Sequence, residues 1–361
     1  MQRRKRIDAA GRPKADYIAR WRDAGRERQK RFARKIDADR FIATLEADLL
    51  RGIWIDPIHG RTPLRIEAEA WFRTASPLLK PKTAASYRSL LDSRLLPALG
   101  HIPIGELRRA AVQSWINEMV CEGLSPSRIR QAHVVLRLLL QGAFLESRTA
   151  TNAAVGIRLP KIERREAPYW EPAIVTRIIR ACPSPYDSFL AVQGKLGLRF
   201  GEAAALRSDS IQPARSDRGA RLKIDRALEE IGGRLHLGST KSHAMRAVPL
   251  PGFLEKQLTQ ISLERDETGM LFLAPRGGPL RYANFRNTVW IPLLDRLAIP
   301  RTGMHILRHS AAAAMINDGA DPKTVQVILG HSSAAFTLTV YGHVFDTNLD
   351  AVAQRMNVDM P

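Results

Sequence analysis

Residues able to bind and attack a phosphate group recur in four short motifs in the second half of the 361-residue chain. Arg199 lies within a Gly-Leu-Arg-x-Gly-Glu sequence, and Lys241 follows at an expected turn between two short strands. His-x-Leu-Arg-His occupies 305–309, and Leu-Gly-His ends at His331, ten residues before Tyr341. Guanidinium groups bind oxyanions bidentately, and a tyrosine hydroxyl can serve as a nucleophile. These residue types favour phosphoryl transfer.

Each motif taken alone also has a structural interpretation. Lys241 would be an ordinary hairpin lysine, and Leu-Gly-His would be the end of a helix. Tyr341 alone would more often be a packed aromatic residue than a nucleophile. His305 and His309, spaced i,i+4, could bind a metal on one helical face, although Arg308 would place a permanent positive charge beside it. The order and spacing of the four motifs together favour a catalytic site over these separate structural interpretations.

Together, the motifs resemble the tyrosine recombinase family, the phage-integrase type of site-specific DNA recombinase. The resemblance covers the segment from about residue 169 onwards. It extends more weakly over the preceding helical segment, which is similar to that family's core-site-binding domain. Residues 1–60 are similar to the arm-site-binding modules of phage integrases. Ile306 departs from the family pattern, because many members have Asp there, but it is not one of the catalytic positions.

The resemblance implies a role for each matching residue. The activating set would be Arg199, Lys241, His305, Arg308 and His331, with Tyr341 as the nucleophile and Glu202 as a supporting acidic residue. Arg199 and Arg308 would neutralise the non-bridging phosphate oxygens. His305 is the candidate acceptor for the tyrosine proton, and Lys241 the candidate donor to the leaving 5′ oxygen. His331 would bind a phosphate oxygen and help to position Tyr341.

Covalent attachment through tyrosine conserves the energy of the phosphodiester, so neither ATP nor a metal is required. We therefore expect no cofactor, and the sequence has neither a Walker-type glycine loop nor an acidic cluster suited to Mg²⁺. The expected product is a 3′-phosphotyrosyl link with a free 5′ hydroxyl. In this family, strand exchange takes place in a homotetramer on double-stranded DNA, so we expect that assembly, with DNA-bending and excision proteins as further candidate partners.

Two other functions compete with this interpretation. A type IB topoisomerase-like enzyme would use similar chemistry as a monomer to relax supercoils, but the separate basic N-terminal module favours recognition of additional DNA sites. A non-catalytic DNA-binding regulator would have lost a catalytic residue, and all six are present. Integration and excision of a phage or other mobile element is favoured over resolution of chromosome dimers, because of the extra module at 1–60.

The charge of the chain agrees with a nucleic-acid partner. Fifty-six Lys and Arg oppose 36 Asp and Glu, which gives a formal net charge of +20. Residues 1–40 alone hold 15 basic and 6 acidic side chains. Such an excess suits phosphate neutralisation on DNA, although a solvated charged face would have the same composition.

The composition also indicates the cellular compartment in which we expect the protein. No apolar run is long enough for a membrane span, and the basic N-terminus lacks the apolar stretch of a secretory signal. The two cysteines, Cys121 and Cys182, are too few for a disulfide framework or a cysteine zinc site, and we expect both to be partly buried. The expected location is the cytoplasm, associated with the nucleoid when bound to DNA.

We predict a multidomain, mainly α fold with small β-sheets. An N-terminal module (1–60) would contain strands at 17–22 and 28–32, a turn at 23–25, and a helix that ends at Gly52. A helical domain (61–160) would include the amphipathic set Val112, Trp115, Ile116, Met119 and Val120. Gly123 would end that helix, and Ser125-Pro126 would start the long helix at 127–146. Lys82, Arg88, Arg94, Arg128, Arg130 and Arg137 could line a DNA-facing surface.

The proline- and charge-rich stretch 158–168 is the expected linker to an α+β catalytic domain at 169–361. Short strands are expected at 222–225, 234–237 and 247–250. A helix would run from His305 to about Asn317. Asp321-Pro322 would cap a short helix that ends at Gly330, and Ser332-Ser333 would cap the helix carrying Tyr341.

Overall fold

The computed structural model describes residues 2–7, 13–23, 26–50, 59–163, 166–239, 245–265 and 269–346. The chain divides into two compact units, Met1–Glu163 and Arg164–Pro361. The division falls within 158–168, the stretch expected to be a linker, and the described residues of that stretch contain neither helix nor strand. Along the described part of the chain, no helix combines the length and apolarity that crossing a membrane requires.

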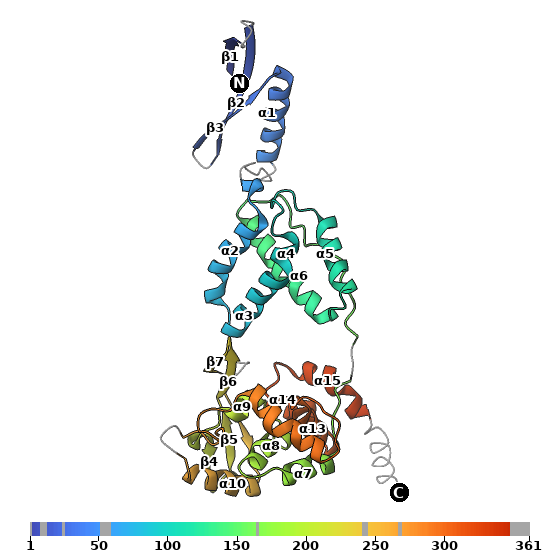
Figure 1. Ribbon diagram of the computed structural model, residues 1–361. Helices are drawn as coiled ribbons and strands as arrows, with labels where there is room; N and C mark the ends of the chain where they lie inside the picture. Colours follow the sequence, from blue (N-terminus) through green and yellow to red (C-terminus); the bar gives the residue numbers. More distant parts are fainter. Residues whose placement is uncertain are drawn as a thin grey trace. The chain divides into compact units, whose positions relative to one another are not determined.

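The first unit begins with a three-stranded antiparallel sheet and one helix (Figure 1). Its elements are β1 (Gln2–Ile7), β2 (Pro13–Asp23), β3 (Arg26–Phe32) and α1 (Lys35–Leu50). The ring of Phe41 on α1 packs edge-on against Trp21 of β2 at 5.3 Å, and Leu45 is buried. Our prediction missed β1, because its sequence Gln-Arg-Arg-Lys-Arg-Ile has no apolar alternation. The expected turn at 23–25 and the helix end at Gly52 include residues outside the described ones.

The rest of the first unit is helical, as predicted. Its elements are η1 (His59–Arg61), α2 (Leu64–Ala75), η2 (Ser76–Leu78), α3 (Pro81–Leu90), the π-helical η3 (Leu91–Leu95), α4 (Leu96–Leu99), α5 (Arg109–Cys121) and α6 (Pro126–Leu145). Four of the five expected apolar residues of α5 are buried, but Val120 is 47% exposed. At 100° per residue, Val120 lies at the edge of the stripe formed by the other four. Cys121 is exposed, so the expectation of partial burial is wrong there.

The expected boundary between α5 and α6 is confirmed. Gly123 has φ +76°, the left-handed conformation that glycine adopts without a steric penalty. Ser125 then caps α6, and its hydroxyl accepts a hydrogen bond from the backbone N–H of Arg128 at 3.3 Å. Pro126 occupies the first helical position, where no hydrogen-bond donor is needed.

The described residues of the second unit form nine α-helices, two short η helices and two small antiparallel sheets (Figure 1). Its helical elements are α7 (Pro172–Ala181), α8 (Tyr186–Gly194), α9 (Phe200–Ala204), η4 (Ser208–Ser210), α10 (Gly252–Leu263), α11 (Tyr282–Phe285), η5 (Arg286–Trp290), α12 (Ile291–Arg296), α13 (His305–Asn317), α14 (Pro322–Leu329) and α15 (Ala334–Asp346). Its strands are β4 (Ile211–Gln212), β5 (Arg221–Ile224), β6 (Arg226–Ile231), β7 (Arg234–Ser239) and β8 (Arg246–Pro249).

The strands form one sheet in the order β4-β5-β8 and one hairpin, β6-β7. The three predicted strands are present as β5, β7 and β8. Our prediction missed β6, although Gly232-Gly233 marks the hairpin: both glycines have positive φ, as a two-residue turn requires. In the sheet, Leu222 pairs with Val248 and both are buried in the main core of this unit.

The last three helices form a cluster of their own around a smaller core (Figure 1, orange to red). The side chain of Asp321 caps α14 by accepting hydrogen bonds from the backbone N–H groups of Lys323 and Thr324. Gly330 ends α14 with φ +68°, and the hydroxyl of Ser333 accepts from the backbone N–H of Phe336 in α15. These expected caps set where α15 begins, and α15 packs against both α13 and α14.

Candidate active site

Arg308 joins three of the four sequence motifs. Its guanidinium Nη1 donates to the carbonyl oxygen of Gly197 at 2.7 Å, and Nη2 donates to the carbonyl oxygen of Leu329 at 2.8 Å. Gly197 belongs to the turn before Arg199, and Leu329 ends α14. Burial, and then repulsion by Arg199, lowers the pKa of Arg308 to about 9, so it stays charged at neutral pH. Of the five N–H groups of a guanidinium, these two contacts use two.

Glu202 is a buried carboxylate among three arginines. It accepts hydrogen bonds from the backbone N–H of Arg199 at 2.9 Å and from its Nη1 at 2.8 Å, so it also caps the start of α9. Arg246 of β8 donates to both carboxylate oxygens, and Arg308 lies 4.0 Å away. Burial alone would raise the pKa of Glu202, but the bonds and charge of Arg246 and Arg199 outweigh it and lower the pKa to about 2. Glu202 therefore holds the arginines in place as an anion.

Tyr341 is buried in the core between α13 and α15, with 1% of the residue exposed. Its hydroxyl oxygen lies 2.8 Å from Nδ1 of His309 on α13. Burial, partly offset by Arg308 and Arg199, raises the pKa of Tyr341 to about 12, so the hydroxyl keeps its proton. Burial and Arg308 lower the pKa of His309, so its imidazole is neutral.

His331 packs on the face of the same tyrosine ring. The two rings are nearly parallel, at 13°, with centroids 6.2 Å apart. Nδ1 of His331 lies 2.9 Å from the hydroxyl of Thr337 on α15, and this bond holds the ring in place. Burial, then the charges of Arg308, Arg199 and Arg246, lowers the pKa of His331 to about 3.

His305 lies at the start of α13, one helical turn before His309. As a residue it is exposed, yet protein atoms around its ring, then the charges of His309 and Arg308, lower its pKa. Its ring meets the ring of His309 edge to face, with centroids 4.8 Å apart. The neighbouring Ile306, where the family pattern has Asp, is buried in the main core. The role expected of His305, acceptance of the tyrosine proton, stays a prediction.

Lys241 falls in 240–244 and lies outside the described residues. The two strands on either side of it are β7, which ends at Ser239, and β8, which begins at Arg246. Its role as proton donor to the leaving oxygen also stays a prediction.

The site therefore combines buried positive charge with neutral imidazoles and a protonated tyrosine. Among the three described arginines of the site, Arg199 is the most accessible, since 29% of its side chain is exposed. Such an arrangement can bind an anionic phosphodiester and stabilise the charge that develops on its oxygens. Within the described residues, no group of three or more His, Cys, Asp or Glu side chains is arranged to hold a metal ion.

Two residues of the site were missed in the sequence. His309 was considered as a metal ligand with His305 and as the end of the His-x-Leu-Arg-His motif, with no catalytic role, and Arg246, just before the strand expected at 247–250, received no role. The i,i+4 spacing of the histidines was a usable signal, because it places both on the same side of α13. The partner of each missed residue comes from a distant segment: Tyr341 lies 32 positions after His309, and Glu202 lies 44 positions before Arg246.

Five of the six basic residues expected on a DNA-facing surface of the helical domain divide into two groups, and the sixth, Arg128, is partly buried in the first turn of α6. Arg88 pairs with Glu69 and Asp92, and Arg94 pairs with Glu122. Arg130 donates to the carbonyl oxygen of Pro160. These three serve the domain's own structure, whereas Lys82 and Arg137 are exposed and suit a DNA-facing surface better.

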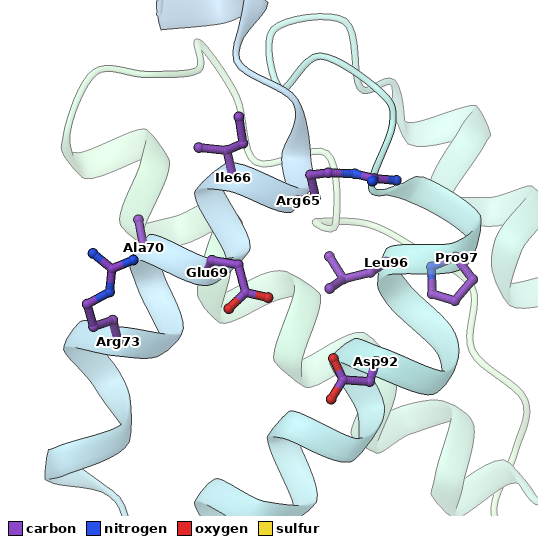
Figure 2. Close-up of a pocket in the computed structure, with 8 residues that line it drawn as sticks. All are labelled: Arg65, Ile66, Glu69, Ala70, Arg73, Asp92, Leu96 and Pro97. Carbon is purple, nitrogen blue, oxygen red and sulfur yellow. The ribbon is translucent and has the colours of Figure 1, made fainter.

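The same helical part contains a surface pocket of about 700 Å³, lined from α2 and from the run η3 to α4 (Figure 2). The carboxylates in it, Glu69 and Asp92, are the two that bind Arg88. Its lining is Arg65, Ile66, Glu69, Ala70, Arg73, Asp92, Leu96 and Pro97. None of the predicted catalytic residues belongs to this pocket.

Comparison with known families covers both units. Residues 171–348 match the phage integrase family, and residues 68–120 match the phage integrase N-terminal SAM-like domain. The first match includes every catalytic candidate from Arg199 to Tyr341.

Similar proteins agree with these matches. A Mycobacterium tuberculosis (strain CDC 1551 / Oshkosh) protein named as a prophage phiRv2 integrase is 26% identical over 327 residues, which cover 86% of this chain and 83% of that protein. Tyrosine recombinase XerD of Corynebacterium glutamicum is 26% identical over 302 residues, covering 76% and 91% respectively.

Among solved structures, the Tn1549 transposon integrase in complex with a circular intermediate DNA superposes with a TM-score of 0.69 at 18% identity, covering 81% of this chain and 99% of that one. A lambda integrase tetramer bound to a Holliday junction gives a TM-score of 0.60 at 17% identity, covering 91% and 96%. At these identities the likeness is one of fold.

Proposed function

Since the chain belongs to the tyrosine recombinase (phage integrase) family, it is a site-specific DNA recombinase, and we propose that it cleaves and rejoins DNA through a 3′-phosphotyrosyl bond at Tyr341. One observation carries the assignment of the site. Residues from three of the motifs converge here: Arg199 and Arg308 meet at the buried carboxylate of Glu202. His331 packs against the ring of the buried Tyr341. Such convergence is what phosphoryl transfer at a single phosphate requires.

The proposed cleavage step combines these positions with the role that the family resemblance implies for Lys241. The oxygen of Tyr341 attacks the scissile phosphorus, and the bond to the 5′ oxygen breaks. Arg199 and Arg308 stabilise the non-bridging oxygens, as forked donors do best when they are held in place beforehand. His331 contacts a phosphate oxygen and keeps the tyrosine ring in position. Lys241 gives a proton to the departing 5′ oxygen.

Two histidines of α13 are candidates to accept the tyrosine proton. His305 was expected from the sequence, and His309 makes the observed contact with the hydroxyl. The phosphotyrosyl bond keeps the energy of the original diester. A 5′ hydroxyl from a second duplex can therefore attack it and exchange the strands without ATP.

The biological reaction that we propose is integration and excision of a phage or another mobile element. The named similarity to a prophage integrase supports it, and so does the basic sheet-and-helix module at the N-terminus. In this proposal residues 1–60 bind arm sites, 61–160 bind the core site, and 169–361 carry the chemistry. DNA-bending and excision proteins would set the direction.

The solved relatives support double-stranded DNA as the partner and a homotetramer as the active assembly. The Tn1549 integrase was solved with DNA, and lambda integrase as a tetramer on a Holliday junction. A monomeric type IB topoisomerase-like activity is the alternative that shares this chemistry, whereas a non-catalytic regulator would have no use for an intact set of catalytic residues.

A library of nicked duplexes tests the proposal. Cleavage beside the nick releases a short 5′-hydroxyl strand, so the covalent adduct cannot revert and accumulates. We expect adducts with one class of sequence, attached through a 3′ phosphate to the peptide that contains Tyr341, as mass spectrometry would show. Failure to form any adduct would contradict the proposal. Adducts without sequence preference, together with relaxation of supercoils by the monomer, would favour the topoisomerase-like alternative.

A further inference from the structure

The hydroxyl of the proposed nucleophile has a specific partner, the last residue of the His-x-Leu-Arg-His motif, to which the sequence analysis gave no catalytic role. Tyr341 Oη and His309 Nδ1 lie 2.8 Å apart, within hydrogen-bond distance. The tyrosine is almost fully buried, and His309 is half-buried beside it. This contact links α15, which carries the nucleophile, to the middle of α13.

The direction of this hydrogen bond depends on the protonation states of the two groups and on the tautomer of His309. The hydroxyl retains its proton, because burial raises the pKa of Tyr341 to about 12. The imidazole is neutral, because burial and Arg308 lower the pKa of His309. When the neutral imidazole carries its proton on Nε2, the hydroxyl supplies the only proton between Oη and Nδ1. In that tautomer Oη–H donates to Nδ1, the geometry from which a general base removes a proton.

The other two histidines are arranged differently. His331 lies on the face of the tyrosine ring, and its Nδ1 is bonded to the hydroxyl of Thr337. His305 contacts the ring of His309 edge to face. His309 thus lies between His305 and the nucleophile.

We propose that His309 is the catalytic residue that accepts the proton of Tyr341 during DNA cleavage, a step that rests on the proposed function and specifies it. As the Oη–P bond forms and the P–O5′ bond breaks, the proton of Oη moves to Nδ1 of His309. Lys241 supplies the proton of the 5′ hydroxyl that leaves. In rejoining, the incoming 5′ hydroxyl returns its proton to Lys241, and the imidazolium returns its own to the tyrosine oxygen.

The anionic phosphate favours this transfer. A phosphate bound beside Arg308 adds a negative charge, which reduces the repulsion between this guanidinium and a protonated His309. The site is therefore set to hold a neutral pair before DNA binds and to tolerate an imidazolium after cleavage.

The test measures first-order cleavage of the nicked duplex that the wild-type chain selects from the library. His309→Asn keeps an amide atom close to the position of Nδ1 but supplies no base, and His309→Leu removes both the bond and the base. We expect both variants to cleave ~10²–10⁴-fold more slowly, the usual range for a lost general base. Non-covalent binding of the same duplex and the melting temperature of His309→Asn should remain at wild-type values.

A second measurement separates proton transfer from positioning. With 3,5-difluorotyrosine incorporated at position 341, the phenol is more acidic and depends less on a base. The defect of both His309 variants should then shrink by at least ~10-fold, whereas a positioning defect would persist. His305→Asn, measured with tyrosine and with 3,5-difluorotyrosine at position 341, serves as the control. The cleavage defect of this variant should not shrink with difluorotyrosine.

The results separate a failure of the proposed function from a failure of the His309 step alone. A wild-type chain that forms no adduct contradicts the proposed function and this step with it. A wild-type chain that forms the adduct, with His309→Asn cleaving within about threefold of it, contradicts this step alone, because a proton acceptor cannot be replaced by an amide. If difluorotyrosine restored cleavage by His305→Asn and not by the His309 variants, His305 would be the residue that accepts the tyrosine proton.

Discussion

The carboxylate of Glu202 and the guanidinium of Arg246 face each other in bidentate geometry within the catalytic unit. Nη1 lies 3.1 Å from Oε1, and Nη2 lies 2.8 Å from Oε2. Both side chains are almost fully buried, and Nε of Arg246 also donates to the carbonyl oxygen of Ile328. Arg246 thus ties β8 to the start of α9 and to the end of α14, the elements that position Arg199 and His331.

Arg246→Met should strongly destabilise the catalytic unit. The substitution leaves the carboxylate of Glu202 buried with one partner fewer, and breaking such a pair typically costs about 3–5 kcal/mol. Arg301→Met is a matched control, because Arg301 also forms a bidentate pair, through Nε and Nη2 with Asp295, but at the surface. Exposed pairs contribute little, so this variant should unfold like the wild type. Equal losses of unfolding free energy in the two variants, measured by urea denaturation, would contradict a special stabilising role of the buried pair.

Glu202 should make the unit sensitive to acid. Its pKa falls from an ordinary value of 4.5 to about 2 in the folded protein, so the unfolded chain takes up its proton first as pH falls. The stabilisation is complete above about pH 5 and is lost progressively down to about pH 2. Glu202→Gln should be less stable at pH 7 and should lose less stability between pH 5 and 2. Parallel curves of unfolding free energy against pH for the two proteins would rule this out.

Tyr341→Phe should abolish the covalent adduct while leaving DNA binding intact. The change removes only the hydroxyl, so the ring can still pack against His331. Tyr282→Phe is the matched control: that tyrosine is 41% exposed, packs edge-on against Phe200, and has no proposed role. Adduct formation by Tyr341→Phe would show that the nucleophile lies elsewhere, and its loss in Tyr282→Phe would point to that residue.

Lys241→Ala should slow cleavage by ~10²–10⁴-fold, the range typical of a lost general acid. Replacing the 5′ bridging oxygen of the substrate with sulfur creates a leaving group that needs no proton. The variant should then cleave at close to the wild-type rate. An equal defect on both substrates would leave Lys241 as a phosphate-binding residue only.

A fragment that begins at Arg61 should still cleave core-site DNA, since every proposed catalytic residue lies beyond residue 169. It should lose high-affinity binding to separate arm sites, and with it full integration between two DNA partners. Its DNA affinity should fall less steeply with salt, because fewer phosphates are neutralised and fewer counterions are released. Integration at the rate of the full chain, with an unchanged salt slope, would show that 1–60 is only a basic surface.

Much of the local structure could be predicted from the sequence, because it depends on neighbours along the chain. The left-handed Gly123 and Gly330, the cap at Asp321 and the start of α13 at His305 were all expected from residues within one helical turn. Where such a signal was weak or overlooked, prediction failed: β1 has almost no apolar residue, and β6 was marked only by the glycine pair that follows it.

The candidate catalytic residues, and the family that they indicate, could be identified from the sequence alone, since a nucleophile, its activating cations and their order are properties of residue type and spacing. Which of these residues touch one another depends on tertiary packing. The contact of His309 with Tyr341 and that of Arg246 with Glu202 join residues 32 and 44 positions apart. Helical periodicity sets which face of a helix a side chain occupies, but the partner of that face depends on how α13, α15, α9 and β8 pack. Burial then changes the pKa values of these groups, which makes tyrosine and histidine a neutral, hydrogen-bonded pair.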